Sequence, residues 1–451
     1  MSSLKQKIKD LVNKRKRQQN QASGTRAATS ATSPQAPAPA AQPSSSQPPP
    51  IGIQSKAVAD VQAATTDGTL QIALVNQSNS DQLYAYITGQ AIDSNYGLFL
   101  LQSDARTPYF PASPGTTGAG IGADIAIPLG APGNTVTATI PRIAGGRIWF
   151  SQGAKLVFAL NPGPGLVEPS IFNPADPNHN INFGFCEFTY NAFQVFVNIS
   201  YVDFVSNIPI ALTLMDTNNN TQRILGMRAD GLSTVARGLR DQTAKDGQAW
   251  SSLIVQSNGQ DLRVLSPNSG ITINNGYFQN YFNDYVNQVY SQHTNQPLIV
   301  NTQAGFGNVN GQVNGDGVMD FGNGSTFPKP TAADIFSSNS GPFATGSNAE
   351  TNTIIPRLAA AFNRSTLLLS NETPNGTNAS QYYKDPVTNH YARIVHDANI
   401  DGLGYTHPYD DVVPDGGASQ AGVVSSGNPR VLTVTVGGNQ AGDSKGGCVI
   451  L

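Results

Sequence analysis

Two carboxylates stand in strand-like, largely apolar sequence near the middle of the chain. In FGFCEFTYN, Glu187 falls on the same face of a predicted strand as Thr189 and Asn191, and the aromatic residues between them point to the other face. Asp203 lies sixteen residues beyond Glu187, in the similar segment VNISYVDFVS, which we also expect to be a strand. These residue types can transfer protons, so the pair is the first candidate for a catalytic site.

Two interpretations of this pair follow from the residues alone. Each carboxylate is either a buried polar group satisfied by hydrogen bonds or part of a cleft, and two acids sixteen residues apart favour the structural interpretation slightly. If they face a cleft, they suit glycoside hydrolysis, which needs one acid to protonate the leaving oxygen and one carboxylate to activate water.

Other familiar motifs fail to appear. The sequence contains no GxxxxGK[ST], HExxH or GxSxG pattern, and its five histidines form no i, i+4 pair. Residues 118–122 resemble part of a dinucleotide-binding loop but lack the strand and helix that should flank it. Two isolated cysteines, Cys186 and Cys448, do not make a zinc site. We therefore expect neither a metal site nor an organic cofactor.

The elements that must position these acids are mostly strands. Charged residues make up 12% of the 451 residues, and glycine (45) and proline (30) are abundant, which favours turn-rich β structure. Short apolar or alternating segments bounded by Asn, Ser, Asp and Gly predict strands at 70–77, 82–90, 135–143, 146–151, 155–160 and 430–438. Strands at this spacing are typical of a β-sandwich or barrel.

A different periodicity follows residue 216. Helical spacing of apolar residues appears in 233–247, 277–293 and 331–338, so we expect a mixed α/β lobe over 217–385. In the second of these segments, Phe278, Tyr281, Phe282, Tyr285 and Val289 form a stripe. A sugar-stacking surface is conceivable there, but we assign the stripe to the core, which is the commoner role.

Charge and cysteine content exclude several classes of protein. The net charge is −3, yet residues 1–17 alone carry +6, so the rest of the chain is acidic and unsuited to nucleic acids. The N-terminus lacks the apolar region of a secretory signal, and no apolar run of 18 residues occurs. With only two cysteines, the sequence is typical of a reducing compartment, and we expect a cytoplasmic protein.

Several blocks together carry a family resemblance. The pair EFTYN…NISYVDFVSNIP is similar to the acidic-cleft signature of the thaumatin-like superfamily and most closely resembles glycoside hydrolase family 64, the laminaripentaose-producing endo-β-1,3-glucanases. The resemblance extends over the blocks GGRIWFS (145–151), KPTAADIF (329–336), RLAAAFNRSTLL (357–368), NHYARIVH (389–396) and DGLGYTHPYDDV (401–412). The family usually has a tryptophan shortly after the first motif, where this chain has Phe196.

The resemblance implies a fold, an activity and residue roles. The fold would be mainly β: a catalytic domain over 68–440, with a thaumatin-like sandwich from 68–216 and 386–440 and the inserted α/β lobe forming a cleft. The activity would be that of a glucan endo-1,3-beta-glucosidase acting on linear β-1,3-glucan by inversion. Glu187 would be the general acid, Asp203 the general base, and Thr189 and Asn191 substrate contacts. A non-catalytic thaumatin-like glucan-binding protein is the alternative.

In the block 401–412, Tyr405, Tyr409, Asp410 and Asp411 resemble a Tyr-Asp-Asp stretch of thaumatin-like proteins. They would lie on the cleft rim or form turns at the end of the sandwich. We favour the second role because Asp is common in such turns.

The two ends of the chain predict a membrane address. Residues 1–22 form a basic segment, 23–67 a low-complexity linker, and 441–451 a flexible tail ending in Cys448-Val449-Ile450-Leu451. This ending fits the Cys-aliphatic-aliphatic-X prenylation motif with X = Leu. Taken alone, the basic segment is equally well explained as a solvated run of charges or as a nuclear-import-like cluster at residues 14–17. Together with the C-terminal motif it suggests a membrane contact, because one lipid chain binds a membrane only reversibly and the basic segment would supply a second contact at an anionic surface.

We therefore predict that Cys448→Ser moves the protein from the membrane fraction to the soluble fraction, because it removes the thiol that would carry the lipid. Fractionation of cells with antibody detection measures this. An unmodified Cys448 by mass spectrometry of the native protein, or an unchanged membrane fraction, would contradict the prediction.

Overall fold

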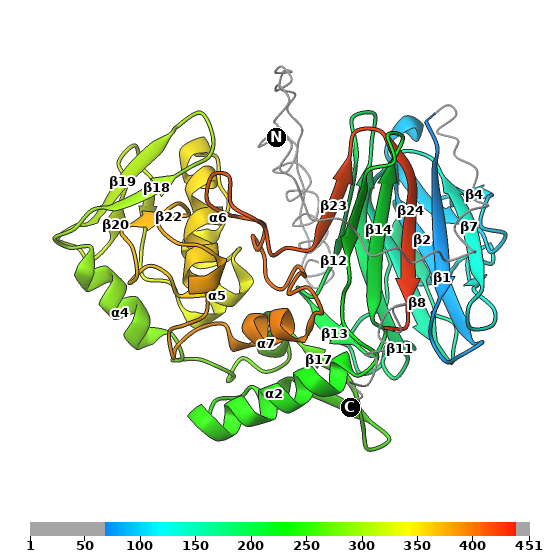
Figure 1. Cartoon of the computed structure of the whole chain (residues 1–451), viewed down its shortest axis with the longest axis horizontal. Helices are drawn as coiled ribbons and strands as arrows, with labels where there is room; N and C mark the ends of the chain where they lie inside the picture. The colour runs from blue at the N-terminus through cyan, green and yellow to red at the C-terminus, as the bar shows by residue number, and fades with distance from the viewer. Residues whose placement is uncertain (1–67, 439–451) are drawn as a thin grey trace, which may run out of the picture. The chain divides into compact units, whose positions relative to one another are not determined.

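A computed structural model describes residues 68–438 (Figure 1). The basic segment 1–22, the linker 23–67 and the tail with Cys448 lie outside the described residues, so the membrane address stays a prediction. Among the helices within 68–438, none combines the length and apolar character needed to cross a membrane.

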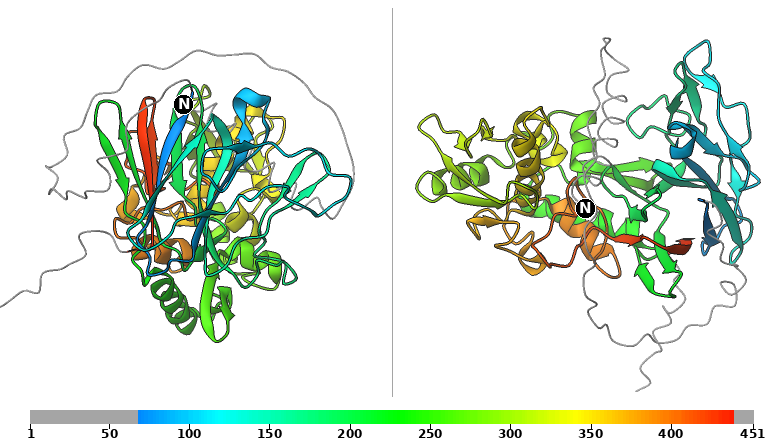
Figure 2. Two further views of the ribbon diagram at one scale, coloured as in Figure 1. Left: turned by 90° about the vertical axis from the view of Figure 1, so that its right-hand side faces the viewer. Right: turned by 90° about the horizontal axis from the view of Figure 1, so that it is seen from above.

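Two sheets form a β-sandwich (Figures 1 and 2). The larger sheet has the order β23-β12-β11-β8-β2-β3-β4, with β6 paired to β2, and the smaller has the order β15-β14-β24-β1-β7. The strands of the larger sheet are β2 (Leu83–Ala91), β3 (Gly97–Leu101), β4 (Pro108–Tyr109), β6 (Ile127–Pro128), β8 (Ile143–Gln152), β11 (Asn182–Tyr190), β12 (Val195–Ile199) and β23 (Val423–Ser426). Those of the smaller sheet are β1 (Leu70–Asn76), β7 (Thr135–Ile140), β14 (Ile210–Asp216), β15 (Thr221–Ile224) and β24 (Pro429–Val436).

The sandwich core follows from the alternation of the strands. On β11, Cys186, Phe188 and Tyr190 are buried, and the Tyr190 hydroxyl donates to the carbonyl of Thr69, next to β1. This face of β11 therefore looks toward the smaller sheet. The last strand, β24, pairs in parallel with β1 and antiparallel with β14, so the C-terminal part of the domain completes the smaller sheet.

Between β15 and β23 the chain forms the mixed α/β lobe. Its helices are α2 (Gly231–Asp246), α3 (Pro267–Ile273), α4 (Asn283–Gln292), α5 (Ala332–Ser337), α6 (Ala349–Arg364) and α7 (His390–Ala398). Its strands are β16 (Ile254–Ser257), β17 (Gln260–Leu265), β18 (Leu298–Asn301), β19 (Asn308–Val313), β20 (Met319–Asp320), β21 (Thr326–Phe327) and β22 (Glu372–Thr373). The remaining short elements are β5 (Ala119–Gly120), β9 (Ala159–Asn161), β10 (Gly165–Val167), β13 (Phe204–Ser206), η1 (Ile92–Ser94), η2 (Ser251–Leu253), η3 (Gly341–Phe343) and η4 (Ala379–Gln381).

The predicted aromatic stripe is part of the core of the lobe. Phe278, Phe282, Tyr285 and Val289 are buried, and Phe278 packs against Trp250 with ring centroids 4.6 Å apart. The helix itself is shorter than predicted, because α4 begins only at Asn283 and the chain before it forms turns.

The mainly β architecture predicted from the sequence is confirmed, whereas the thaumatin-like topology stays a prediction. The boundaries of the lobe differ from those expected. β15 extends the first part of the sandwich to Ile224, beyond residue 216. Strands return to the sandwich only from Val423, not from 386, because α7 packs on α2 in the lobe.

One buried ion pair ties the segment 401–412 to α6. Asp410 is fully buried, and its carboxylate lies 3.1 Å from the Arg364 guanidinium and contacts His396 and His407 at 3.1 and 3.2 Å. It also accepts hydrogen bonds from the backbone and hydroxyl of Thr406, as a turn-forming acid should. Burial alone would raise the pKa of Asp410, but His407 and His396 hold it well below its usual range.

We predict that Asp410→Asn destabilises the protein at pH 7 by about 3–5 kcal/mol, because it leaves the charge of Arg364 buried without its counter-ion. Since the pKa of Asp410 is lowered by folding, its contribution is complete above about pH 4 and is lost as the pH falls below that value. Urea denaturation at pH 7 and pH 3 measures both effects.

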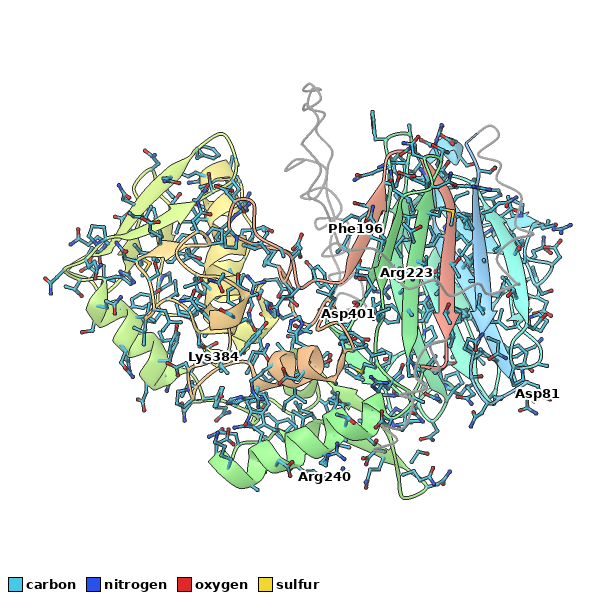
Figure 3. The ribbon with its side chains drawn as sticks, in the orientation of Figure 1. Asp81, Phe196, Arg223, Arg240, Lys384 and Asp401 are labelled. Carbon is cyan, nitrogen blue, oxygen red and sulfur yellow. The ribbon has the colours of Figure 1, made fainter. Side chains whose placement is uncertain are left out.

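The matched control is Asp261→Asn. Asp261 pairs with Arg240 of α2, which is 46% exposed and is labelled in Figure 3. Loss of a surface pair should cost less than about 1 kcal/mol. Equal stability of Asp410→Asn and the wild type at pH 7 would show that the buried pair does not stabilise the lobe.

Candidate active site

Strand register places Glu187 in a row of polar residues across the larger sheet. Its Cα partner on β8 is Arg147, and its partner on β12 is Asn198. Residues directly opposite one another on antiparallel strands project from the same face of the sheet. Glu187 therefore points away from the sandwich core, as the alternation of β11 predicts, and its side chain is 21% exposed.

A glycine opposite Phe188 allows this register. Gly146 of β8 is the Cα partner of Phe188, and a Cβ on Gly146 would lie 2.4 Å from the Phe188 ring. Only glycine leaves room for the ring, which fills the core side of the strand pair. The packing of Phe188 thus fixes Glu187 on the opposite face, next to Arg147.

The Arg147 guanidinium is the centre of the site. Its Nη2 and Nε atoms lie 3.2 and 3.3 Å from Oε1 of Glu187, and its Nη1 donates to Oε2 of Glu168 at 2.9 Å. The group lies over the rings of Phe185 and Trp149, at 4.5 and 5.2 Å from their centroids. These contacts hold the charge in one place beside the candidate acid.

Asp203, from a different segment of the chain, also interacts electrostatically with the Arg147 guanidinium. Burial alone would lower the pKa of Arg147, but the charges of Glu168, Glu187 and Asp203 raise it. Glu187 and Asp203, which the sequence analysis paired, therefore both act on one guanidinium.

The prediction that Asp203 lies within a strand is wrong. β12 ends at Ile199, and the chain then bridges to Tyr405: Tyr201 N donates to Tyr405 O at 2.8 Å, and Tyr405 N donates to Ile199 O at 3.0 Å. Asp203 follows in a bend just before β13, where its carbonyl accepts from Ser266 N at 2.9 Å. The backbone position of Asp203 therefore depends on pairing with Tyr405, about 200 residues further along the chain.

The two expected substrate contacts occupy different environments. Thr189 is buried on the face of Glu187, opposite Phe196 of β12, which is half-buried and labelled in Figure 3. Asn191 does not lie on the strand, because β11 ends at Tyr190. Its Oδ1 accepts from the backbone of Phe193 and Gln194 at 2.8 and 3.0 Å, so this side chain closes the turn between β11 and β12.

Arg147 and Glu168 are site residues that the sequence analysis missed. A signal for Arg147 was present, since it is the one charged residue in the predicted strand 146–151. Glu168 follows the short strand β10 and had no comparable signal. Within residues 68–438 no cluster of three or more His, Cys, Asp or Glu side chains could hold a metal ion.

The block at 405–411 flanks the bend that carries Asp203. The Tyr405 hydroxyl donates to Oδ1 of Asp411 at 2.9 Å, and burial raises the pKa of Tyr405 well above its usual value. Tyr391 of α7 donates to the carbonyl of Tyr201 at 2.6 Å. The lobe therefore contacts the bend at several points, and Asp203 is placed by both parts of the domain.

Comparisons with known proteins point to one family. The model of glycoside hydrolase family 64, described as β-1,3-glucanase, matches residues 68–436. A laminaripentaose-producing β-1,3-glucanase, solved in complex with laminaritetraose, is 32% identical with a TM-score of 0.72, and the match covers 82% of this chain and 99% of that one. A β-1,3-glucanase domain from Clostridium beijerinckii shares the fold at 22% identity and a TM-score of 0.64, covering 83% of this chain and all of that one.

Curated relatives agree with this match. The glucan endo-1,3-beta-glucosidases of Cellulosimicrobium cellulans and Arthrobacter sp. (strain YCWD3) are each 27% identical over 382 residues, which is 82% of this chain. The chain spans 66% of the length of these relatives.

Proposed function

The chain belongs to glycoside hydrolase family 64, and on this premise we propose that it hydrolyses internal linkages of linear β-1,3-glucan. The similar structure solved in complex with laminaritetraose supports this substrate class. The described domain coincides with the region that the family model spans, so the proposed activity belongs to residues 68–436.

In the proposed mechanism Glu187 donates a proton to the leaving glycosidic oxygen. Asp203 takes a proton from a water molecule, which attacks the anomeric carbon from the opposite side of the sugar ring. The bond to the leaving oxygen breaks as the new bond forms, and the configuration at the anomeric carbon inverts. Thr189, on the face of Glu187, contacts the bound sugar, and Asn191, whose Oδ1 closes the turn after β11, contacts it through its amide Nδ2. Two carboxylates and a water molecule suffice for this reaction, so it requires no cofactor.

One observation carries this assignment: Glu187 and Asp203, from separate elements, both act on the charge of Arg147. Glu187 remains 21% exposed, so solvent, and by extension a substrate, can reach its carboxyl group. A carboxylate that only balanced a buried charge would have no need of that exposure.

We predict that Glu187→Gln and Asp203→Asn each lower the turnover of laminarin by about two to four orders of magnitude, the usual contribution of a positioned acid or base. Both replacements keep the shape of the side chain, and Glu168 remains as a counter-ion of Arg147, so the protein should stay folded with at most a modest loss of melting temperature. Release of reducing ends from laminarin measures turnover, with Asp261→Asn as the control at a surface ion pair.

Near-normal turnover in either variant would move the site elsewhere. A wild-type protein that binds laminarin or curdlan without releasing reducing ends would instead be a glucan-binding protein, and the hydrolase assignment would fail.

A further inference from the structure

The ion pair between Arg147 and Glu168 lies deeper than Glu187. The side chain of Glu168 is 5% exposed and that of Arg147 is 11% exposed, compared with 21% for Glu187. The Arg147 contact with Glu168 is also the shorter one, at 2.9 Å compared with 3.2 Å. Glu168 is therefore the more closely bound and more buried partner of the guanidinium.

This arrangement addresses a conflict in the proposed mechanism. A general acid must hold a proton until the leaving group takes it, whereas a neighbouring guanidinium stabilises the ionised carboxylate. If Glu187 were the sole partner of Arg147, the pairing would favour loss of that proton. A second carboxylate on the same guanidinium weakens this effect, because its negative charge offsets the positive charge that Glu187 experiences.

We propose that Glu168 is a positioning residue and the principal counter-ion of Arg147. Its negative charge reduces the electrostatic stabilisation of ionised Glu187 by Arg147, so Glu187 keeps the proton that it donates. This inference rests on the proposed function, in which Glu187 is the general acid. Glu168 acts through Arg147, and its deep burial keeps it from the reacting atoms.

Aromatic side chains around Arg147 fix the geometry of its contacts with Glu168 and Glu187. Trp149 donates from Nε1 to the hydroxyl of Thr88 at 3.1 Å, and its ring packs on Phe185 with centroids 4.7 Å apart. Both rings lie against the guanidinium, so Arg147 is held between its two carboxylates. The charged groups that act on Arg147 are Glu187 from β11, Glu168 after β10 and Asp203 from the bend before β13. Burial raises the pKa of the neighbouring Cys186 thiol most, and the charge of Glu187 also raises it.

Substitutions of the two partners should act in opposite directions. Glu168→Gln leaves the charge of Arg147 without its principal counter-ion, so Glu187 ionises more readily. The basic limb of the pH–rate profile, where the general acid loses its proton, then moves to lower pH by about one unit. Arg147→Met removes the positive charge and leaves the negative charge of Glu168 to oppose ionisation of Glu187, so the basic limb moves to higher pH.

The first test measures kcat/KM for laminarin against pH in the wild type and in these variants. Glu168→Asp, which keeps the charge, should retain the wild-type position of the basic limb even if its rate is lower. The double variant Arg147→Met/Glu168→Gln removes both charges and should return the limb toward the wild-type position. Asp261→Asn controls for the loss of a carboxylate elsewhere.

A shift in the same direction for Glu168→Gln and Arg147→Met, or a lower rate with unmoved limbs, would overturn the proposal. A common direction would mean that Glu168 does not oppose the effect of Arg147 on Glu187, and unmoved limbs would mean that Glu168 supports the fold without influencing the proton on Glu187.

A second test does not depend on turnover. In protein labelled with ¹³C at the glutamate carboxyl carbons, the Glu187 signal can be assigned by its loss in Glu187→Gln. Its titration should move to lower pH in Glu168→Gln and to higher pH in Arg147→Met, and an unchanged titration would overturn the proposal. Failure of the wild type to hydrolyse laminarin would reject the proposed function alone, because the titration tests the charge arrangement separately.

Discussion

A single buried guanidinium group determines how the candidate site is built. A positive charge removed from water must be balanced, and an unbalanced one would cost several kcal/mol. Arg147 is balanced by carboxylates from three separate segments and is held by the rings of Phe185 and Trp149. The β8–β11 register, which the Gly146–Phe188 packing permits, brings Glu187 to this charge. The acid is thus part of the charge balance of the sheet as well as of the proposed chemistry.

The position of Asp203 depends on the lobe. The chain leaves β12 at Ile199 and pairs with Tyr405, whose segment is tied to α6 by the buried Asp410–Arg364 contact. Tyr201 donates to Asn399 at 3.1 Å and accepts from Tyr391. Long-range contacts of this kind join the two parts of the domain at the candidate site: the sandwich positions Glu187, and the lobe helps to position Asp203.

The sequence predicts some of these features well, for identifiable reasons. Strand alternation is local, so the face of Glu187 and the mainly β fold could be deduced from residue order. The bend at Asp203 could not, because it depends on pairing with Tyr405, some 200 residues away. Asn191 was placed on a strand because the period continues through it, but its side chain closes a turn instead. Glu168 was missed because a lone acid after a short strand has no local pattern.

We propose that Glu187 and Asp203 work as acid and base on opposite sides of the sugar ring. The anomeric form of the first product tests it most directly. Proton NMR recorded during the first minutes of laminarin hydrolysis, before mutarotation, should show the α-anomer at the new reducing end, as inversion of a β linkage requires. The β-anomer as first product would contradict the account, because it would mean that one carboxylate attacks the sugar instead of activating water.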